Sequence, residues 1–360
     1  MVTNFQTTLL NFICQGIGHS IRNNYHSIEW GALHNAAIQQ GLSAIVLDGI
    51  NASFINIKST SSDNQNKLEW IGEVMQNYEG RFKEYERAIA LLAKFYNEHG
   101  LKMMVLKGYA CSLDWPKPEH RPCGDIDIWL FGKQKEADAL FVKEKGIKVD
   151  TSHHHHTVFG WNGFTVENHY DFVNIYSRQS SKELEIIFKE LGQDDTHFAE
   201  VNGEKVYLPS PNLHALFLIK HMVSHFAAAE ITLRQVLDWA FFVEKHTNEI
   251  DWKWLVGLLK KYHMKDFYNC INAICVGDLG FDVRLFPSVQ FDPVLKDKVL
   301  ADILSPAYGS AEPHGFVKRM TYKYRRWQGN AWKQRLCYPE SRWCAFWMGI
   351  WAKLLKPAAI

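Results

Sequence analysis

The sequence predicts an α+β protein, and three patterns lead to that fold class. A helical repeat of apolar residues covers 71–96, short strand-like segments lie between about 100 and 210, and helical patterns continue from about 211 onward. The chain has 360 residues, of which 47% are hydrophobic and 22% charged. This composition is typical of a folded protein and excludes disordered, collagen-like and disulfide-scaffold classes.

The N-terminal segment, residues 1–99, is predicted to be helical and to pack on the part that follows. Short helical patterns occupy residues 1–60, and one apolar stripe then advances in steps of four and three residues. The stripe consists of Ile71, Met75, Tyr78, Phe82, Tyr85, Ile89, Leu92 and Tyr96. We expect it to pack on its own domain, although the same pattern could join two chains in a coiled coil.

Residues 100–210 carry the strand patterns and are predicted to form the core. The strands are expected at 101–106, 125–130, 157–161 and 164–171. Asn162-Gly163 between the last two is a signal for a tight hairpin turn. Side chains alternate between the two faces of a strand, so Asp125 and Asp127 share one face, and Glu167 and His169 also share one.

The rest of the chain is predicted to be a helical domain, 211–315, followed by a basic aromatic tail, 316–360. Helices of the domain are expected at 211–227, 232–247, 251–263 and 266–278. The tail has ten Lys and Arg against one acid, and Trp343, Trp347 and Trp351 share one helical face. Three uses of the tail stay open: docking on the domain with buried Trp side chains, contact with an anionic membrane surface, or contact with RNA.

The net charge and the cysteine content limit the kinds of binding partner and the cell compartment that the sequence favours. The net charge of +1 gives no global field that would favour nucleic acid or membrane. The seven cysteines are scattered without a C-x-x-C pair, and we expect reduced thiols in a cytoplasmic protein. No signal peptide is recognised, and the longest apolar run near the end, 343–355, is too short to cross a bilayer. Nothing indicates the oligomeric state.

Two groups of histidines are given a structural interpretation. His153–His156 are expected to form a solvent-exposed connection. Metal capture there is the alternative, and it is disfavoured because adjacent ligands on a strand or loop point in different directions. His221 and His225 have an i, i+4 spacing that zinc could use, but the intervening residues lack the Glu of zinc proteases. We interpret this pair as packing or as lining of a substrate site.

The strand that bears Asp125 and Asp127, combined with Glu167 on a later strand, carries the chemical information. Two carboxylates on one face repel each other unless a cation lies between them. Mg²⁺ suits such a place, because it binds one or two carboxylates and keeps other positions for water and phosphates. A third carboxylate could complete a two-metal site and accept a proton from an attacking hydroxyl.

The stretch 106–130 resembles the uncharacterised nucleotidyltransferase family of the polymerase-beta-like superfamily. The matching elements are Leu106, Lys107-Gly108, Arg121-Pro122 and Gly124-Asp125-Ile126-Asp127-Ile128. Glu167 and His169 match a later pattern of the family, and His221, His225, Arg234 and Asp238 match helical patterns more loosely. Lys107-Gly108 is the rule in this family, whereas the wider superfamily has Gly-Ser, so the Ser contact to phosphate is missing here.

The resemblance implies a nucleotidyltransferase-like mixed sheet and transfer of a nucleoside monophosphate from an NTP such as ATP to an unknown acceptor. Asp125, Asp127 and Glu167 would bind two Mg²⁺ ions, with Glu167 also the general base. Lys107, Gly108, Arg121, Gly124 and His169 would contact the substrate. Arg121 could instead pair with Asp125 or Asp127, and His169 could be a hydrogen-bonded core residue. The alternative function is a non-catalytic nucleotide-binding or regulatory protein with the same fold.

Overall fold

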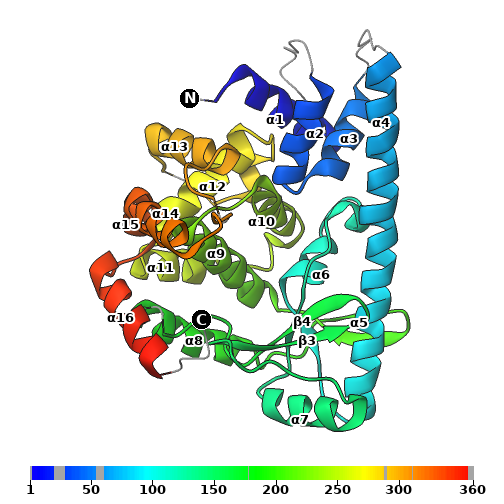
Figure 1. Cartoon of the computed structure of the whole chain (residues 1–360), viewed down its shortest axis with the longest axis vertical. Coiled ribbons are helices and arrows are strands. Elements are labelled where there is room, and N and C mark those ends of the chain that lie inside the picture. Colours follow the sequence, from blue (N-terminus) through cyan, green and yellow to red (C-terminus); the bar gives the residue numbers. More distant parts are fainter. Residues whose placement is uncertain are drawn as a thin grey trace.

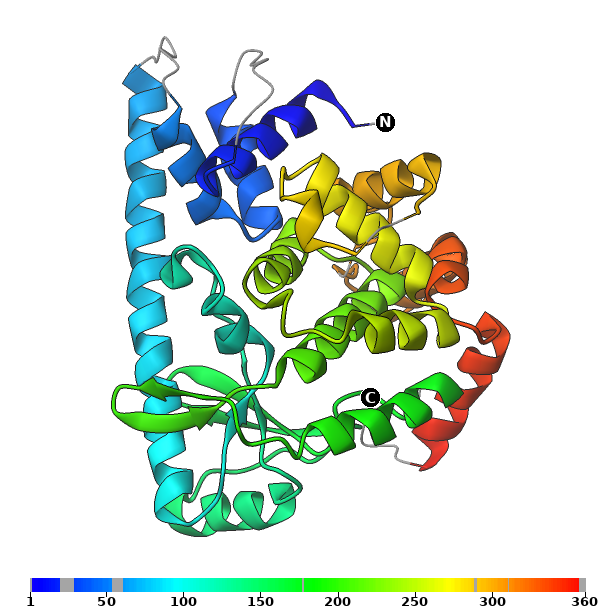
Figure 2. The ribbon, with the colours of Figure 1, turned by 180° about the vertical axis from the view of Figure 1, so that it is seen from behind.

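Short helices and one long helix build the N-terminal part of the molecule (Figure 1). The structure is a computed structural model that describes residues 2–19, 29–53, 61–176, 178–287, 290–309 and 311–355. The short helices are α1 (Asn4–Gly16), α2 (Trp30–Gln39) and α3 (Ser43–Ala52). The long helix runs along one side of the molecule and consists of α4 (Ser61–Val74), a π-helical turn (Met75–Gly80) and α5 (Arg81–Glu98) (Figure 2).

The π-helical turn changes which residues of the long helix are buried. From Tyr78 onward the predicted stripe is confirmed, but Met75 is 60% exposed. Before the turn, Trp70 and Val74 are buried instead, one position earlier than predicted. A π-helical turn closes i→i+5 hydrogen bonds and therefore holds an extra residue, which shifts the phase of the apolar pattern. The stripe packs within its own chain, as expected.

A mixed sheet forms the centre of the fold, with strand order β3-β4-β2-β1-β6-β5. The strands are β1 (Met104–Val105), β2 (Ile126–Trp129), β3 (His156–Trp161), β4 (Phe164–His169), β5 (Phe198–Val201) and β6 (Glu204–Tyr207). The pairs β1–β6 and β2–β4 are parallel, whereas β1–β2, β3–β4 and β5–β6 are antiparallel. The predicted α+β class is confirmed.

Two hairpins use the same two-residue turn. Asn162-Gly163 joins β3 to β4, and Asn202-Gly203 joins β5 to β6; all four residues have positive φ, as a type I′ turn requires. The first hairpin is the predicted one. The second was not predicted, and β1 is shorter than the apolar run at 101–106 suggests.

Each face of the sheet packs against a different layer of helices. Ile126 and Ile128 of β2 point toward α5 and α7 (Gln134–Lys145) and belong to one apolar core. Trp129, on the opposite face, belongs to a second core that includes side chains of α8 (Gln179–Leu191) and α9 (Pro211–Ala228). Because Asp127 shares the face of Trp129, it points toward the C-terminal helices.

The C-terminal helices cover that second face of the sheet. They are α9 (Pro211–Ala228), α10 (Leu233–His246), α11 (Trp252–Lys261), α12 (Lys265–Gly277) and α13 (Pro293–Leu304). The four predicted helices of this region are confirmed to within one or two residues at most boundaries. No helix among the described residues has the length and apolar content needed to cross a membrane.

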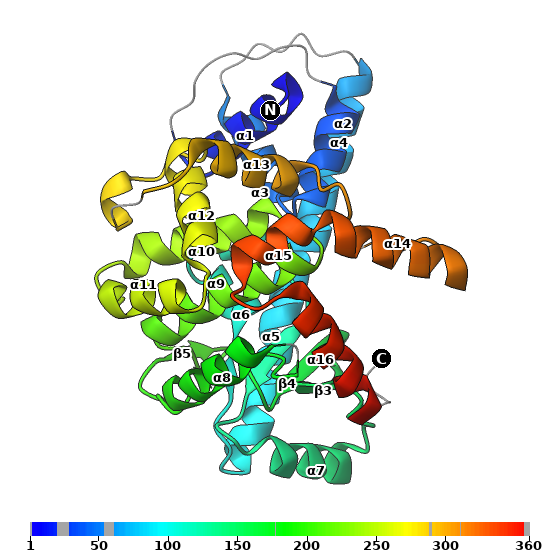
Figure 3. The ribbon, with the colours of Figure 1, turned by 90° about the vertical axis from the view of Figure 1, so that its left-hand side faces the viewer.

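The tail is only partly docked on the body. It forms α14 (Phe316–Gly329), α15 (Ala331–Cys337) and α16 (Arg342–Leu355). In α15, Lys333 and Cys337 are buried, and Trp332 packs edge-on against Phe226 of α9. By contrast, α14 projects from the body (Figure 3). Docking with buried Trp side chains is therefore wrong for α16, whose Trp343, Trp347 and Trp351 are exposed.

Candidate active site

Asp127 and Glu167 lie opposite each other on neighbouring parallel strands. The register of β2 and β4 pairs Asp127 with Glu167, so both carboxylates emerge from the same face. Asp125 immediately precedes β2 and is more exposed than Asp127. All three carboxylates line one cavity of about 810 Å³ between the sheet and the helices α9 and α10. The remaining predicted site residues also line it, namely Lys107, Gly108, Arg121, Gly124 and His169.

Lys107 is brought to Asp127 by an abrupt bend in the chain after β1. Lys107 is the first residue of α6 (Lys107–Ser112), and its ammonium lies 2.7 Å from an Asp127 carboxylate oxygen. The next residue, Gly108, has φ of 31°, a conformation that favours glycine. A Cβ atom there would lie 2.7 Å from the hydroxyl of Tyr85, which itself donates a hydrogen bond to the backbone carbonyl of Asp125. Gly108 thus lets the Lys107 segment approach the aspartate strand closely.

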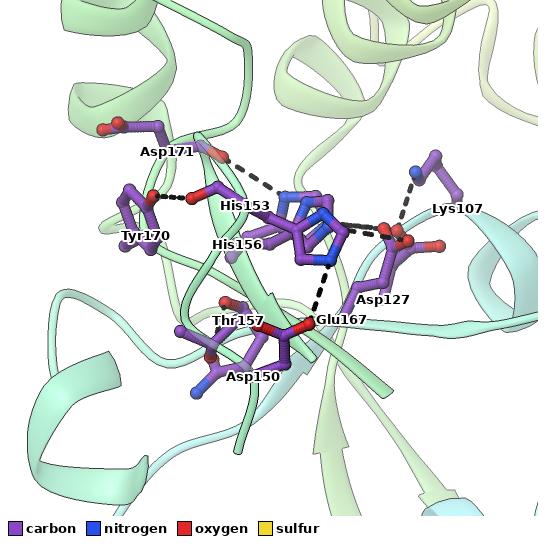
Figure 4. Close-up of polar contacts among 11 residues, drawn as sticks. Lys107, Asp127, Asp150, His153, His156, Thr157, Glu167, Tyr170 and Asp171 are labelled. Atoms are coloured by element: carbon purple, nitrogen blue, oxygen red, sulfur yellow. Dashed lines mark hydrogen bonds and ion pairs between the residues drawn. The ribbon is translucent and has the colours of Figure 1, made fainter. Parts of the chain in front are cut away.

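His169 joins the two carboxylates on the sheet. Its Nε2 lies 3.0 Å from Oδ1 of Asp127 and 3.6 Å from Oε2 of Glu167, while Nδ1 lies 3.2 Å from the backbone carbonyl of Asp171. Figure 4 shows Lys107 directed at Asp127 on the other side. A carbonyl only accepts, so Nδ1 carries a proton and donates it. The remaining nitrogen therefore faces two carboxylates and needs a positive charge, either its own proton or a bound cation.

The carboxylates differ in their pKa because their surroundings differ. Burial opposes ionisation of Asp127, but the Lys107 ammonium and His169 hold its pKa well below the usual value. Burial raises the pKa of Asp125, and repulsion from Glu167 and Asp127 raises it further. Burial also opposes ionisation of Glu167, but the contact with His169 and the nearby His156 and Lys107 together lower its pKa. Asp127 and Glu167 are consequently ionised at neutral pH, and negative charge accumulates at this end of the cavity.

Arg121 is held by a residue that the sequence did not suggest as its partner. Its guanidinium donates from Nε and Nη2 to the two oxygens of Asp238 on α10, at 2.8 and 3.0 Å, and both residues are buried. Trp115 Nε1 donates to the same carboxylate at 2.9 Å. The predicted alternative, a pair with Asp125 or Asp127, is therefore wrong, because the guanidinium pairs with Asp238 instead.

The cavity wall formed by α9 and α10 supplies positive and imidazole groups. Arg234 lines the cavity, whereas Asp238 on the same helix is held by Arg121 through both of its oxygens. His221 and His225 also line it, with ring centroids 4.3 Å apart, and burial lowers the pKa of both. Their interpretation as lining is in agreement with this placement.

A family model for uncharacterised nucleotidyltransferases matches residues 26–276 of the sequence. The chain belongs to this family. Its structure was also matched to the crystal structure of an antigenic nucleotidyltransferase-like protein from Paracoccidioides brasiliensis, with 14% identity over 56% of this chain and 94% of that one. The TM-score of 0.37 is too low for this likeness to carry an argument. Comparison with curated protein sequences gave no match.

Within this nucleotidyltransferase chain, the residues around Asp127 fit a divalent cation. The donor atoms of Asp127, Glu167 and His169 lie within 4.8 Å of one another. Asp125 is not part of that group, although it lines the same cavity. The Lys107 ammonium now partly balances the charge of Asp127, and it would have to move for a metal ion to bind on that side. The donor atoms that lie close enough together for one ion thus come from two carboxylates and one imidazole, and Asp125 lines the cavity beside them.

Two histidines of the site were missed by the sequence interpretation. His156 is only 7% exposed and His155 is half-buried, so the expectation of a solvent-exposed connection is wrong for both. Burial lowers the pKa of His155 to about 2 and that of His156 to about 4. The predicted hairpin turn could have revealed that His156 belongs to the site. Counting back along both strands from Asn162-Gly163 pairs His156 with His169.

Proposed function

We propose that this chain is a Mg²⁺-dependent nucleotidyltransferase that moves a nucleoside monophosphate from an NTP to a hydroxyl or phosphate acceptor and releases pyrophosphate. The observation that carries the proposal is the pairing of Asp127 with Glu167 on adjacent parallel strands, facing a cavity that also contains Lys107. Membership of the nucleotidyltransferase family supports the same reaction class. The acceptor and the preferred NTP are left undefined by these residues.

Asp125, Asp127 and Glu167 would hold up to two Mg²⁺ ions, which supply neutralisation of the triphosphate and align it for in-line displacement. Lys107 would exchange its contact with Asp127 for a contact with a phosphate oxygen. Arg234, on the opposite wall, is placed to bind the triphosphate from the other side. Its planar fork suits two phosphate oxygens at once.

Glu167 is the proposed general base for a hydroxyl acceptor. It is ionised at neutral pH, because His169 lowers its pKa. The acceptor oxygen forms a bond to the α-phosphorus, the bond from that phosphorus to the β-phosphate oxygen breaks, and the acceptor proton passes to Glu167. His169 would position this carboxylate through the 3.6 Å contact between Nε2 and Oε2.

The test is incubation of the full chain with each α-labelled NTP and Mg²⁺, together with extracts that supply acceptors. Pyrophosphate release and transfer of label are measured for the wild type and for Asp127→Asn. We expect labelling by the wild type alone. Binding of an NTP without turnover, equal in both proteins with every acceptor pool, would instead support the alternative of a non-catalytic nucleotide-binding or regulatory protein.

A second candidate function is attachment to an anionic membrane surface through the tail. The aromatic face of α16, formed by Trp343, Phe346, Trp347 and Trp351, is 44–65% exposed. Basic side chains accompany it, and Arg342 stacks over Trp327 and Trp343. Amphipathic aromatic rings beside Lys and Arg are typical of helices that lie in a membrane interface.

Vesicle sedimentation tests this attachment. The wild type should sediment with phosphatidylserine-containing vesicles and not with purely zwitterionic ones, and Trp347→Ala/Trp351→Ala should lose the binding. Exposed Leu68 on α4 provides a matched control, because Leu68→Ala removes an apolar group far from the tail. Binding that is unaffected by the Trp substitutions, or that is shown only toward RNA, would remove the membrane interpretation.

A further inference from the structure

We propose that the histidine cluster formed by His155, His156 and His169 binds a divalent transition-metal ion of the Zn²⁺ type. One potential donor atom from each of these side chains lies within 4.8 Å of the others. This distance is short enough for a single ion to bind all three after small side-chain movements, since Zn²⁺ lies about 2.0–2.1 Å from each imidazole nitrogen. The cluster adjoins the carboxylate group and shares His169 with it.

The backbone explains how neighbouring histidines converge. His156 begins β3 and pairs with His169 across the hairpin, whereas His155 precedes the strand and does not follow its alternation. The rings of His155 and His156 are nearly perpendicular, with centroids 4.4 Å apart, and the centroids lie 5.6 and 5.3 Å from that of His169. The argument against adjacent ligands on a regular strand therefore does not apply here.

Buried nitrogen atoms in the cluster lack the partners that such atoms normally have. Among the described residues, Nδ1 of His155 and Nδ1 of His156 have no hydrogen-bond partner. A buried polar atom without a partner destabilises the folded chain, and metal coordination would remove this cost where the lone pair is used. The Nδ1–H of His169 donates a hydrogen bond to the backbone carbonyl of Asp171. A histidine that binds a metal through one ring nitrogen usually donates from the other in this way.

The donor type decides the class of ion. Imidazole nitrogen suits zinc and other borderline transition metals, whereas Mg²⁺ prefers oxygen ligands. Glu167 lies beside the cluster, with Oε1 3.8 Å from Nε2 of His156, and adds negative charge next to the ion without being one of its ligands. Three imidazoles would fill three of the four positions of a tetrahedral Zn²⁺ and leave the fourth for water.

Zinc binding is measured first on the untagged full chain without nucleotide, by competition with a chromophoric chelator. We expect one high-affinity Zn²⁺ that excess Mg²⁺ does not displace. In His155→Gln/His156→Gln the affinity should fall at least about tenfold, or 1.4 kcal/mol. His153→Gln is the matched control, because it alters the same histidine tract outside the cluster and should retain the wild-type affinity.

A second measurement on the wild type does not depend on the variants being folded. Replacing Zn²⁺ with Cu²⁺ and recording pulsed electron paramagnetic resonance should reveal couplings from at least two imidazole nitrogens. Unchanged zinc affinity in His155→Gln/His156→Gln, or a spectrum without imidazole couplings, would overturn the proposal. Because neither measurement uses an NTP, zinc binding and nucleotidyl transfer can fail independently.

Discussion

Asp127 and Asp238 face the same cavity but are held in opposite ways. Asp238 is enclosed by the fork of Arg121 and the indole of Trp115, which together bind both of its oxygens. Asp127 contacts a lysine and a histidine on one oxygen, next to two further carboxylates. One aspartate is thus balanced by fixed donors, whereas the other belongs to a group with excess negative charge. Only the second arrangement has a use for an added cation.

Matched Asp→Asn substitutions separate these two situations, and Asp238→Asn should have the largest effect on stability. It leaves the Arg121 charge buried without its counter-ion, and breaking a buried pair costs about 3–5 kcal/mol. Urea unfolding followed by far-ultraviolet circular dichroism measures this loss. A loss below about 1 kcal/mol, the range of exposed pairs, would mean that water reaches Arg121 in solution.

Asp127→Asn should leave the fold intact and abolish most of the transfer reaction. The substitution relieves repulsion with Asp125 and Glu167 but removes the charge that Lys107 and His169 contact, so we expect a loss of stability that is smaller than that of Asp238→Asn. Loss of one charged group that stabilises the transition state lowers kcat on the order of 10²–10³-fold. Single-turnover kinetics with the preferred NTP measures it. If Asp127→Asn were as destabilising as Asp238→Asn, the contrast between the two aspartates would be lost.

Lys107→Met should weaken NTP binding by about tenfold, since hydrogen bonds to charged groups contribute roughly 1.5–3 kcal/mol and part of this is already used on Asp127. The methionine keeps the length and apolar stem of the side chain, so folding is preserved. Isothermal titration calorimetry with a non-hydrolysable NTP checks the value. Lys102→Met, on an exposed ion pair with Asp195, is the control and should bind normally.

Arg234→Lys should have the smallest effect, a few-fold rise in KM for the NTP. The charge is kept but one of two parallel hydrogen bonds is lost, worth about 1 kcal/mol. Steady-state kinetics at saturating acceptor measures the change. An unaltered KM would assign Arg234 to the wall of the cavity alone, and the triphosphate would then be bound entirely from the sheet side.

Local sequence patterns predicted the sheet side of the cavity well. Alternation placed Asp125 and Asp127 on one face, and the Asn162-Gly163 turn fixed the strand that carries Glu167. These features depend on residues close together in the chain. The same register implies that His156 meets His169, which contradicts the expectation of a solvent-exposed histidine connection.

The side of the cavity formed by α9 and α10 could not be predicted from local patterns in the same way. Arg121 and Asp238 are 117 residues apart, and only the packing of α10 against the segment before β2 brings them together. No periodicity within either segment encodes that meeting. The exposure of the Trp side chains on α16 is equally hidden, because helical spacing identifies a face but does not show what covers it.

Because of the π-helical turn at Met75–Gly80, the faces that the two halves of the long helix present depend on the number of residues between them as well as on the residue types. Trp70 donates from its indole to Ser43 of α3 on one side of that turn, while Tyr85 on the other side reaches the aspartate strand. The turn absorbs its extra residue locally, whereas deleting one amino acid from the regular α-helix on either side would rotate one half of the rod by about 100° against the other. Either the contact of Trp70 with α3 or the contact of Tyr85 with the aspartate strand would then be lost.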